Sequence, residues 1–282
     1  MKVLGIVASR RRLGNSEILV KEALLRAKEM GAEVEAIRLT DYEVKVCKAC
    51  YACLWDECRI DDDVNWIFDK MADADGVVLG TPVYILMVPG ILKMLTDRVL
   101  SQFARVERYF GKPAGVIVTA GKEGWEGLGV PTASIFLNTM GFRVVYRLLA
   151  YGRGPGEVLL NPENVRRARA LGEVLIRSAR GEEVEVEMEG CPICGATFYE
   201  VVGEGVVRCP ICRIEGRLVK EGGRFKPVYS REEVEKRRKP EFYLEHADWL
   251  RWTKEKYEEM MEEIKKLRRK YEEFDPFIRK RG

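Results

Sequence analysis

KVLGIVASRRRLGNS, residues 2–16, decides the fold of this chain of 282 residues. The apolar run that ends at Ala8 predicts a buried strand, residues 9–16 predict a polar loop, and the amphipathic pattern of residues 18–30 predicts a helix. Such a loop can cradle a phosphate group, because its N–H groups and the positive end of the helix dipole face the anion. In the alternative interpretation, Asn15 or Ser16 caps the helix and the arginines are solvated.

The same alternation continues to residue 179. Further strands are predicted at residues 34–39, 76–80, 113–120 and 144–150, and further helices end at residue 71 or cover residues 89–103, 131–140 and 163–179. Five strands that alternate with five helices predict an α/β fold with a doubly wound, five-stranded parallel sheet. Ligands of such sheets bind beyond the carboxyl ends of the strands.

Three loops meet at that edge of the predicted sheet: residues 9–16, 81–86 and 119–127. The side chains of the first loop that can bind a phosphate are Ser9, Asn15, Ser16 and either Arg11 or Arg12. The other two loops bring backbone amides and the rings of Tyr84 and Trp125 beside a planar group, which describes a pocket for FMN. Both aromatic residues are equally compatible with core or rim positions. The chain has neither a G-x-G-x-x-G fingerprint nor a Walker A loop.

CKACYACLWDEC, residues 47–58, has the spacing C-x2-C-x2-C-x4-C. Three thiolates at two-residue intervals let one tight loop wrap the corner of a cubane, and a fourth closes a four-thiolate iron-sulfur site. The spacing therefore predicts one [4Fe-4S] cluster held by Cys47, Cys50, Cys53 and Cys58. A lone zinc ion usually draws two C-x2-C pairs from separate knuckles. The alternatives are disulfides, structural zinc and buried thiols.

Two C-x2-C knuckles with fourteen residues between them follow in the second half of the chain, at Cys191, Cys194, Cys209 and Cys212. This spacing predicts a zinc ribbon. Zinc would hold together a module that is too small to bury a sufficient core by itself. A rubredoxin-like iron site, which would act as an additional electron carrier, and paired disulfides are the alternatives.

Composition excludes some classes of function. The net charge of +3 creates no global field that attracts nucleic acid. The apolar run at the N-terminus is too short for a signal peptide or a membrane span, so we expect a cytoplasmic protein whose thiols are available for metal. Charged residues make up 33% of the chain and Gln102 is its single glutamine, a bias that suits a thermophile.

Three stretches together resemble the iron-sulfur flavoproteins of the NADPH-dependent FMN reductase group, which has a flavodoxin-like fold: residues 8–16, the cysteine run, and residues 80–84 followed by 90–98. The resemblance covers residues 1 to about 180. It implies that FMN phosphate binds to the first loop and that the isoalloxazine ring lies against residues 82–86 and 119–124. The contact residues that it implies are Ser9, Arg11, Gly14, Asn15, Ser16, Thr81, Pro82, Val83, Tyr84, Ile85, Leu86, Thr119, Ala120, Gly121 and Gly124.

The resemblance also implies a [4Fe-4S] cluster near the flavin, and homodimers or homotetramers that bring the cluster and the flavin of neighbouring subunits together. Two departures stand out. Arg10 takes a position where relatives often have Pro, and the third loop lacks the usual Gly-Gly-rich pattern.

We expect four parts along the chain: a flavodoxin-like FMN domain at residues 1–181, a zinc-ribbon or rubredoxin-like module at 186–220, a linker at 221–240 and a C-terminal helix at 241–275. The narrow apolar stripe of that helix predicts packing either on the main domain or on another subunit. His246 is the single histidine and is taken as structural, so no histidine-based acid–base mechanism is expected.

These features predict an oxidoreductase that moves electrons between a one-electron carrier, such as ferredoxin, and FMN through the [4Fe-4S] cluster. No residue is assigned a catalytic role, because the protein supplies placement and potential tuning. An NAD(P)H-dependent FMN or quinone reductase is the first alternative. The second is a non-catalytic binding module in which the ribbon and the terminal helix recognise a partner. We expect no membrane partner and no nucleic acid.

Overall fold

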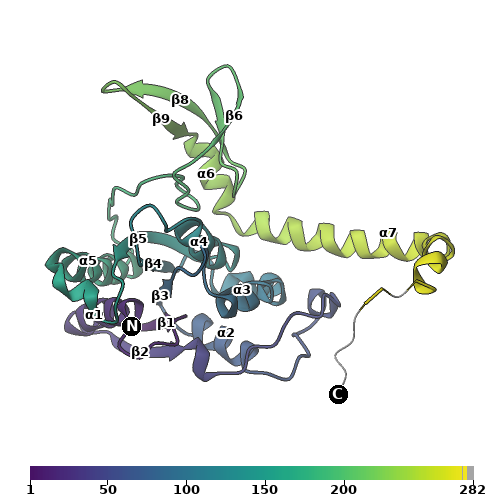
Figure 1. Cartoon of the computed structure of the whole chain (residues 1–282), viewed down its shortest axis with the longest axis horizontal. Helices are drawn as coiled ribbons and strands as arrows, with labels where there is room; N and C mark the ends of the chain where they lie inside the picture. The colour runs from purple at the N-terminus through teal and green to yellow at the C-terminus, as the bar shows by residue number, and fades with distance from the viewer. Residues whose placement is uncertain (275, 278–282) are drawn as a thin grey trace.

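The computed structural model describes residues 1–274 and 276–277. Its first part is a parallel sheet with the strand order β2-β1-β3-β4-β5 (Figure 1). The strands are β1 (Lys2–Val7), β2 (Glu33–Arg38), β3 (Gly76–Pro82), β4 (Pro113–Ala120) and β5 (Arg143–Tyr151). This is the order of flavodoxin-like doubly wound sheets, so the predicted fold class is confirmed.

Helices cover both faces of this sheet. They are α1 (Asn15–Glu29), α2 (Val64–Ala72), α3 (Gly90–Thr96), α4 (Gly129–Thr139) and α5 (Pro162–Ala179). Side chains of α1 and α5 form one core cluster with Val3 and Val7 of β1, whereas α2, α3 and α4 pack with Leu4 and Ile6 on the other face. Because both faces of β1 are buried, the strand is a continuous apolar run rather than an alternating one.

Short 3-10 segments complete this domain: η1 (Leu39–Asp41), η2 (Ala52–Leu54), η3 (Val99–Arg108) and η4 (Glu157–Leu160). The helix expected at residues 89–103 is divided into α3 and η3, and η3 carries on to Arg108. The close packing of α1 against α5 depends on Gly172 of α5. A Cβ atom at that position would lie 2.2 Å from the carbonyl oxygen of Ala23 in α1.

The second part is an antiparallel sheet of four strands in sequence order. These are β6 (Glu200–Gly203), β7 (Val206–Arg208), β8 (Glu215–Glu221) and β9 (Arg224–Tyr229), followed by α6 (Arg231–Arg237). The linker expected at residues 221–240 is therefore wrong, since it contains β9 and α6. Gly222 and Gly223, both with positive φ, make the turn between β8 and β9. This hairpin is exposed on most of its surface, so its sequence carries little of the apolar signal by which strands are predicted.

α7 (Pro240–Glu272) is the C-terminal helix. Its bounds agree with the expected helix to within a few residues, although Asp275, the last residue of the expected range, lies outside the described residues. The helix starts beside the sheet domain and extends away from it (Figure 1). No helix in the described residues is long and apolar enough to cross a membrane.

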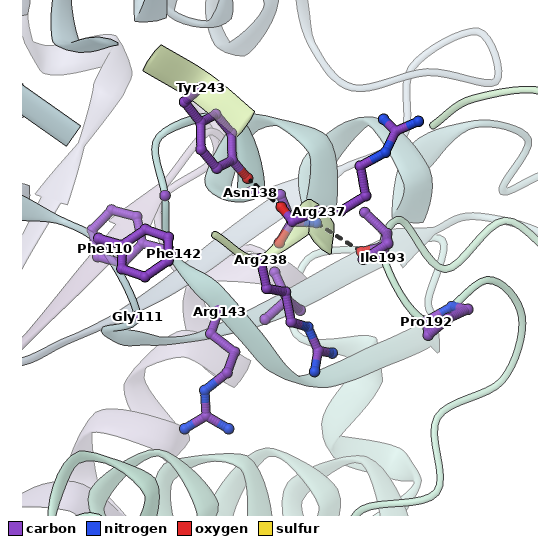
Figure 2. Close-up of a pocket in the computed structure, with 12 residues that line it drawn as sticks. Phe110, Gly111, Asn138, Phe142, Arg143, Pro192, Ile193, Arg237, Arg238 and Tyr243 are labelled. Atoms are coloured by element: carbon purple, nitrogen blue, oxygen red, sulfur yellow. Dashed lines mark hydrogen bonds between the residues drawn. The ribbon is translucent and has the colours of Figure 1, made fainter. Parts of the chain in front are cut away.

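The sheet domain, the first cysteine knuckle, the end of α6 and the start of α7 meet at one junction, which Figure 2 shows. Asn138 of α4 donates from Nδ2 to the carbonyl oxygen of Ile193 at 2.7 Å, and Tyr243 of α7 donates to the carbonyl oxygen of Arg237 at 3.4 Å. Phe110 and Phe142 complete the apolar side of the junction, which encloses a void of about 50 Å³. The second sheet is therefore attached to the sheet domain through specific hydrogen bonds to its first cysteine knuckle.

Candidate functional site

A cavity of about 220 Å³ lies at the carboxyl ends of β1, β3, β4 and β5. Eleven of the fifteen expected contact residues line it: Ser9, Arg11, Gly14, Asn15, Ser16, Pro82, Val83, Tyr84, Thr119, Ala120 and Gly121. Thr81, Ile85, Leu86 and Gly124 are not among the lining residues. The loop after β5 adds Gly152, Arg153 and Pro155, which the sequence analysis missed. No motif in the sequence marks this loop, and the pairing of β4 with β5 in the structure places the end of β5 beside Thr119 and Ala120.

Side chains of the first loop bind to neighbouring segments and do not cap α1. The hydroxyls of Ser16 and Thr119 lie 2.7 Å apart, which ties α1 to the end of β4. Asn15 donates from Nδ2 to the carbonyl oxygen of Gly152 at 2.9 Å, and its Oδ1 accepts from the N–H of Val158 at 3.4 Å. The N-cap residue of α1 is Gly14, which has no side chain to accept a hydrogen bond, so the capping interpretation of Asn15 or Ser16 is wrong.

An uncapped helix N-terminus leaves its first-turn N–H groups available to an anion. Glu17, in that first turn, does not oppose an anion strongly because its carboxylate is already engaged. It accepts from Lys21 at 2.7 Å, from Arg38 at 2.7 Å and from the N–H of Leu13 at 3.0 Å. Burial raises the pKa of Glu17, but these hydrogen bonds outweigh it and leave the pKa below its ordinary value. Arg11 and Arg153 bring positive charge to the lining of the cavity from two loops.

Residues 84–87 form a tight turn at the rim of this cavity. Tyr84 and Met87 exchange backbone hydrogen bonds of 2.8 and 3.2 Å, and the two residues between them, Ile85 and Leu86, both have positive φ. This conformation favours glycine or asparagine, so a β-branched Ile85 with 94% of its surface exposed is strained. The N–H of Leu128 holds the turn through the carbonyl oxygen of Leu86 at 2.7 Å.

Tyr84, Ile85, Leu86 and Met87 of this turn are exposed, and so is Trp125. Tyr84 is thus a rim residue of the cavity, whereas Trp125 lies at the surface and is not among the lining residues. Strained backbone persists where the surroundings impose it, and such positions gather at ligand sites. The turn therefore presents an apolar edge beside the polar cavity, which suits a ligand with a planar ring at one end and an anionic group at the other.

The first cysteine set lines a second cavity, of about 390 Å³, between the loop of residues 47–60 and the start of η3. All four thiols are free, so the disulfide alternative is wrong. Ala49 and Tyr51 have positive φ, which lets the loop turn back on itself. Cys47 and Cys50 are exposed, and Cys53 and Cys58 are half-buried. The four cysteines thus line one shared space, of a size that could hold a group larger than one ion.

A buried cation lies under this loop. Arg98 is 2% exposed and forms an ion pair with Asp62 at 2.8 Å, while its Nη1 also donates to the carbonyl oxygen of Lys45 at 3.3 Å. Its Nε is buried and has no hydrogen-bond partner in the described part of the chain. Arg98 lines the same cavity as the four cysteines, so an unused buried donor stands beside four soft ligands.

The most buried part of this loop disfavours a charged thiol at Cys53 in the absence of a metal. Burial, followed by the charges of Cys58, Cys47 and Cys50, raises the pKa of Cys53 to about 11. A positively charged iron centre would remove that opposition, and thiolates are the ligands that iron-sulfur clusters require. The residues present therefore fit a [4Fe-4S] cluster: four thiolates around one cavity, and a buried Arg98 whose donor is unused.

The second cysteine set is compact. The sulfur atoms of Cys191, Cys194, Cys209 and Cys212 all lie within 4.8 Å of one another, and the thiols are buried. Two sulfur–sulfur distances are 3.4 and 3.5 Å, far beyond the bond length of about 2.05 Å in a disulfide. Four sulfurs at about 2.3 Å from one tetrahedral ion would lie about 3.8 Å apart. This set therefore fits a single metal ion, and paired disulfides are excluded here too.

Arg147 of β5 anchors this second set to the sheet domain. Its Nη2 donates to the carbonyl oxygens of Ile193 at 2.7 Å and Pro192 at 3.2 Å, and its Nε donates to Ser134 at 3.2 Å. Burial lowers the pKa of Arg147 to about 10, against the opposing effect of the nearby thiolates. The guanidinium group thus places a positive charge beside four ligands that carry negative charge when metal is bound.

His246, the single histidine of the chain, contacts two aromatic rings. His246 stacks on Trp249 with a centroid distance of 5.7 Å and meets the edge of Phe103 at 5.9 Å. The first contact lies within α7 and the second joins α7 to η3, and both agree with a structural role for the single histidine.

The chain is similar to known flavin-binding proteins. Residues 1–150, more than half of the chain, match the family model of the NADPH-dependent FMN reductases. An iron-sulfur flavoprotein of Methanocaldococcus jannaschii is 48% identical over 99 residues, which cover 35% of this chain and 51% of that protein. One of Archaeoglobus fulgidus is 42% identical over 109 residues, which cover 39% and 53%. The chain thus spans about half the length of these curated relatives.

Two further similarities extend beyond the matched segment. A second iron-sulfur flavoprotein of Methanocaldococcus jannaschii is 29% identical over 210 residues, covering 72% of this chain and 98% of that protein. A solved structure of a flavone reductase superposes over 100% of both chains with a TM-score of 0.77 at 24% identity, which shows a shared fold. The sheet order, the cavity at its carboxyl edge and the matched segment lead to one conclusion. The chain belongs to the NADPH-dependent FMN reductase family.

Proposed function

We propose that this protein is a flavin-dependent oxidoreductase that binds FMN in the cavity at the carboxyl edge of the sheet and a [4Fe-4S] cluster in the loop of residues 47–58. The observation that carries the proposal is that all four cysteines of this loop line one cavity, in a chain whose fold provides an anion-binding helix N-terminus. Similarity to the iron-sulfur flavoproteins supports it. Family membership also favours an enzyme over a non-catalytic binding module.

In this proposal the chain divides the binding of FMN between its loops. The N–H groups of the first turn of α1, the Ser9 hydroxyl and the charges of Arg11 and Arg153 hold the phosphate. The strained turn at residues 84–87 and the loop Thr119–Gly121 hold the ring. Asn15 acts differently from the expectation, since it positions the loop of residues 152–158 and leaves the phosphate to its neighbours.

Bound FMN would supply a centre that exchanges one or two electrons, and the cluster one that exchanges a single electron. Two equivalents of a reduced one-electron carrier protein would supply the two electrons that a two-electron acceptor needs, with protons from solvent. The role of the chain is to place Arg98 beside the four thiolates and the aromatic rim beside the flavin cavity. No side chain is required to act as a nucleophile or to form a bond to the substrate.

The family model favours NAD(P)H as an alternative electron donor. The two donors are separated by anaerobic stopped-flow spectroscopy at the flavin absorbance. The proposal expects fast bleaching with a reduced ferredoxin and slow bleaching with NADPH. Fast bleaching with NADPH in protein from which the cluster has been removed would establish the alternative instead.

We further propose zinc in the second cysteine set, because its sulfurs are buried and gathered around a space for one ion. Free thiols at all eight cysteines suit a reducing compartment such as the cytoplasm. The decisive experiment counts iron, sulfide, zinc and FMN per chain in one anaerobically purified and reconstituted sample. Four irons, four sulfides, one zinc and one FMN are expected, and a sample without iron and flavin absorbance would refute the proposed function.

A further inference from the structure

The C-terminal helix α7 carries a heptad pattern. Leu250, Tyr257, Ile264 and Tyr271 recur every seventh residue. A second series, displaced by three residues, comprises Thr253, Met260 and Leu267, and Phe274 continues its spacing two residues beyond the end of α7. Seven of these eight side chains are apolar. Apolar residues that alternate in this way over more than three heptads are typical of a coiled coil.

The first third of α7 is already packed. Tyr243 and Ala247 are buried on the sheet domain. Arg251 donates from Nη2 to the carbonyl oxygen of Leu54 at 2.8 Å, and the ammonium group of Lys254 lies 4.4 Å from the ring centroid of Trp55. These contacts hold the base of the helix against η2, the segment inside the first cysteine loop.

The remaining part of the helix leaves this support. Its ion pairs join residues of the helix itself, as between Lys256 and Glu259 and between Lys265 and Glu262. Of the apolar residues from here on, Tyr257, Met260, Ile264, Leu267 and Tyr271 of α7, together with Phe274 just beyond the end of the helix, follow the heptad spacing, and we call these six residues the distal seam. Leu267 is 65% exposed and Phe274 68%, and Figure 1 shows the helix extending away from the sheet domain. The seam continues the face that is buried at the base, over about 21 Å of helix between Tyr257 and Tyr271.

We propose that the distal seam pairs with the distal seam of a second copy of this chain, as an antiparallel coiled coil. In one register every seam residue meets an apolar partner of the other series. Met260 then lies opposite Tyr271 of the second copy and Ile264 opposite Leu267, while Tyr257 meets Phe274 just beyond the end of α7. Each pair occurs twice by symmetry.

Charge complementarity supports this register. Glu263 and Lys270 flank the seam at the heptad position that faces its equivalent across an antiparallel pair. The register places Glu263 of each copy opposite Lys270 of the other. Neither residue has an ion-pair partner among the residues that the structure describes, although Lys270 lies over the ring of Tyr271 at 4.7 Å. An antiparallel pair also keeps the two sheet domains at opposite ends of the coil, whereas a parallel pair would bring both to the same end.

The first test is the mass of the full-length protein in solution, measured by sedimentation over a range of concentrations. The double substitution Ile264→Glu with Leu267→Glu places four carboxylates in the centre of the seam, so the mass is expected to fall by half. Lys266→Glu, on the opposite face of α7, is the matched control and is expected to keep the wild-type mass. An unchanged mass in the double variant would overturn the proposal. A wild-type protein that is already monomeric would do the same.

Charge exchange tests the direction of pairing. Glu263→Lys alone and Lys270→Glu alone each place like charges opposite one another, and each is expected to weaken association about fivefold. The combination of both substitutions restores opposite charges only in the antiparallel register, so it is expected to recover wild-type association. In a parallel coil Glu263 faces Arg268 instead, and the combination would stay as weak as Glu263→Lys. That result would contradict the antiparallel arrangement.

Discussion

The two sets of four cysteines have the same number of ligands and opposite surroundings. The sulfurs of the ribbon set, Cys191 to Cys212, are buried, lie within 4.8 Å of one another and are attached to β5 by Arg147. Those of the loop set, Cys47 to Cys58, line an open cavity of about 390 Å³ and two of them are exposed. The ribbon set is thus arranged around a space for one ion, whereas the loop set lines a larger cavity.

In the proposed function, this difference corresponds to a structural role for the ribbon set and a role in electron exchange for the loop set. A buried, compact site keeps its ion away from solvent and partners, which suits zinc that stabilises a small module. An open site beside the surface lets a cluster exchange electrons with another protein, because exposure and nearby charge both act on its potential. Arg147 and Arg98 supply the nearby charge at the two sites, and the Nε of Arg98 is buried without a hydrogen-bond partner in the described part of the chain.

Removal of one ligand from each set is the strongest way to break the comparison. Cys194→Ala is expected to release zinc and unfold residues 191–229, because structural zinc contributes on the order of 10 kcal/mol to folding. Cys50→Ala is expected to abolish iron while zinc, FMN and the ribbon persist. Metal analysis with hydrogen exchange of the ribbon amides measures both. If Cys50→Ala unfolded the ribbon, or Cys194→Ala left it folded, the assignment of the two sets would be wrong.

The buried ion pair under the loop set is the next most sensitive point. Arg98→Gln leaves Asp62 buried without its partner, which is expected to reduce the free energy of unfolding by about 3–5 kcal/mol. The matched control is Arg105→Gln, which removes the pair between Arg105 and Glu57, where both side chains are at least one-third exposed. Its expected cost is at most about 1 kcal/mol. Urea unfolding of the metal-free proteins compares them, and equal losses would refute the structural role of Arg98.

Acid is expected to weaken the same ion pair between Arg98 and Asp62, with a smaller effect on the unfolding free energy. Burial raises the pKa of Asp62, but hydrogen bonds from Arg98 and from the backbone outweigh it, so the folded-state pKa lies below the ordinary value. The resulting stabilisation is present above the unfolded-state pKa of about 3.9 and is lost as the pH falls through the folded-state value. The difference in unfolding free energy between wild type and Arg98→Gln is therefore expected to shrink from pH 7 to pH 3. A constant difference would exclude Asp62 as the titrating group.

The smallest expected effect lies outside both cysteine sets and tests whether flavin binding is independent of them. Arg11 lines the flavin cavity and its neighbour Arg12 does not. Arg11→Ala is expected to weaken FMN binding by about tenfold, since a charge-assisted hydrogen bond contributes about 1.5–3 kcal/mol. Arg12→Ala is expected to change it little. Fluorescence titration of the flavin-free proteins measures both, and iron and zinc contents should stay at wild-type values.

Much of this site was open to prediction because local patterns encode it. Spacing alone grouped the eight cysteines into two sets, and the apolar runs alone located the five strands. The residues that line the flavin cavity at the ends of β1, β3 and β4 were also expected, since parallel strands bring their carboxyl ends to one edge. Gly152, Arg153 and Pro155 were missed because the loop after β5 has no motif of its own, and only its pairing beside β4 places it there.

The sequence by itself determined the order of strands and helices, the two groups of metal ligands and the basic loop at the start of α1, because each depends on residues close together in the chain. Only the tertiary structure decided what those groups face. Arg98 reaches Asp62 across 36 residues, Asn15 reaches Gly152 across 137, and Arg251 reaches Leu54 across 197. Such contacts follow from packing of distant segments, and no periodicity or spacing in the chain records them.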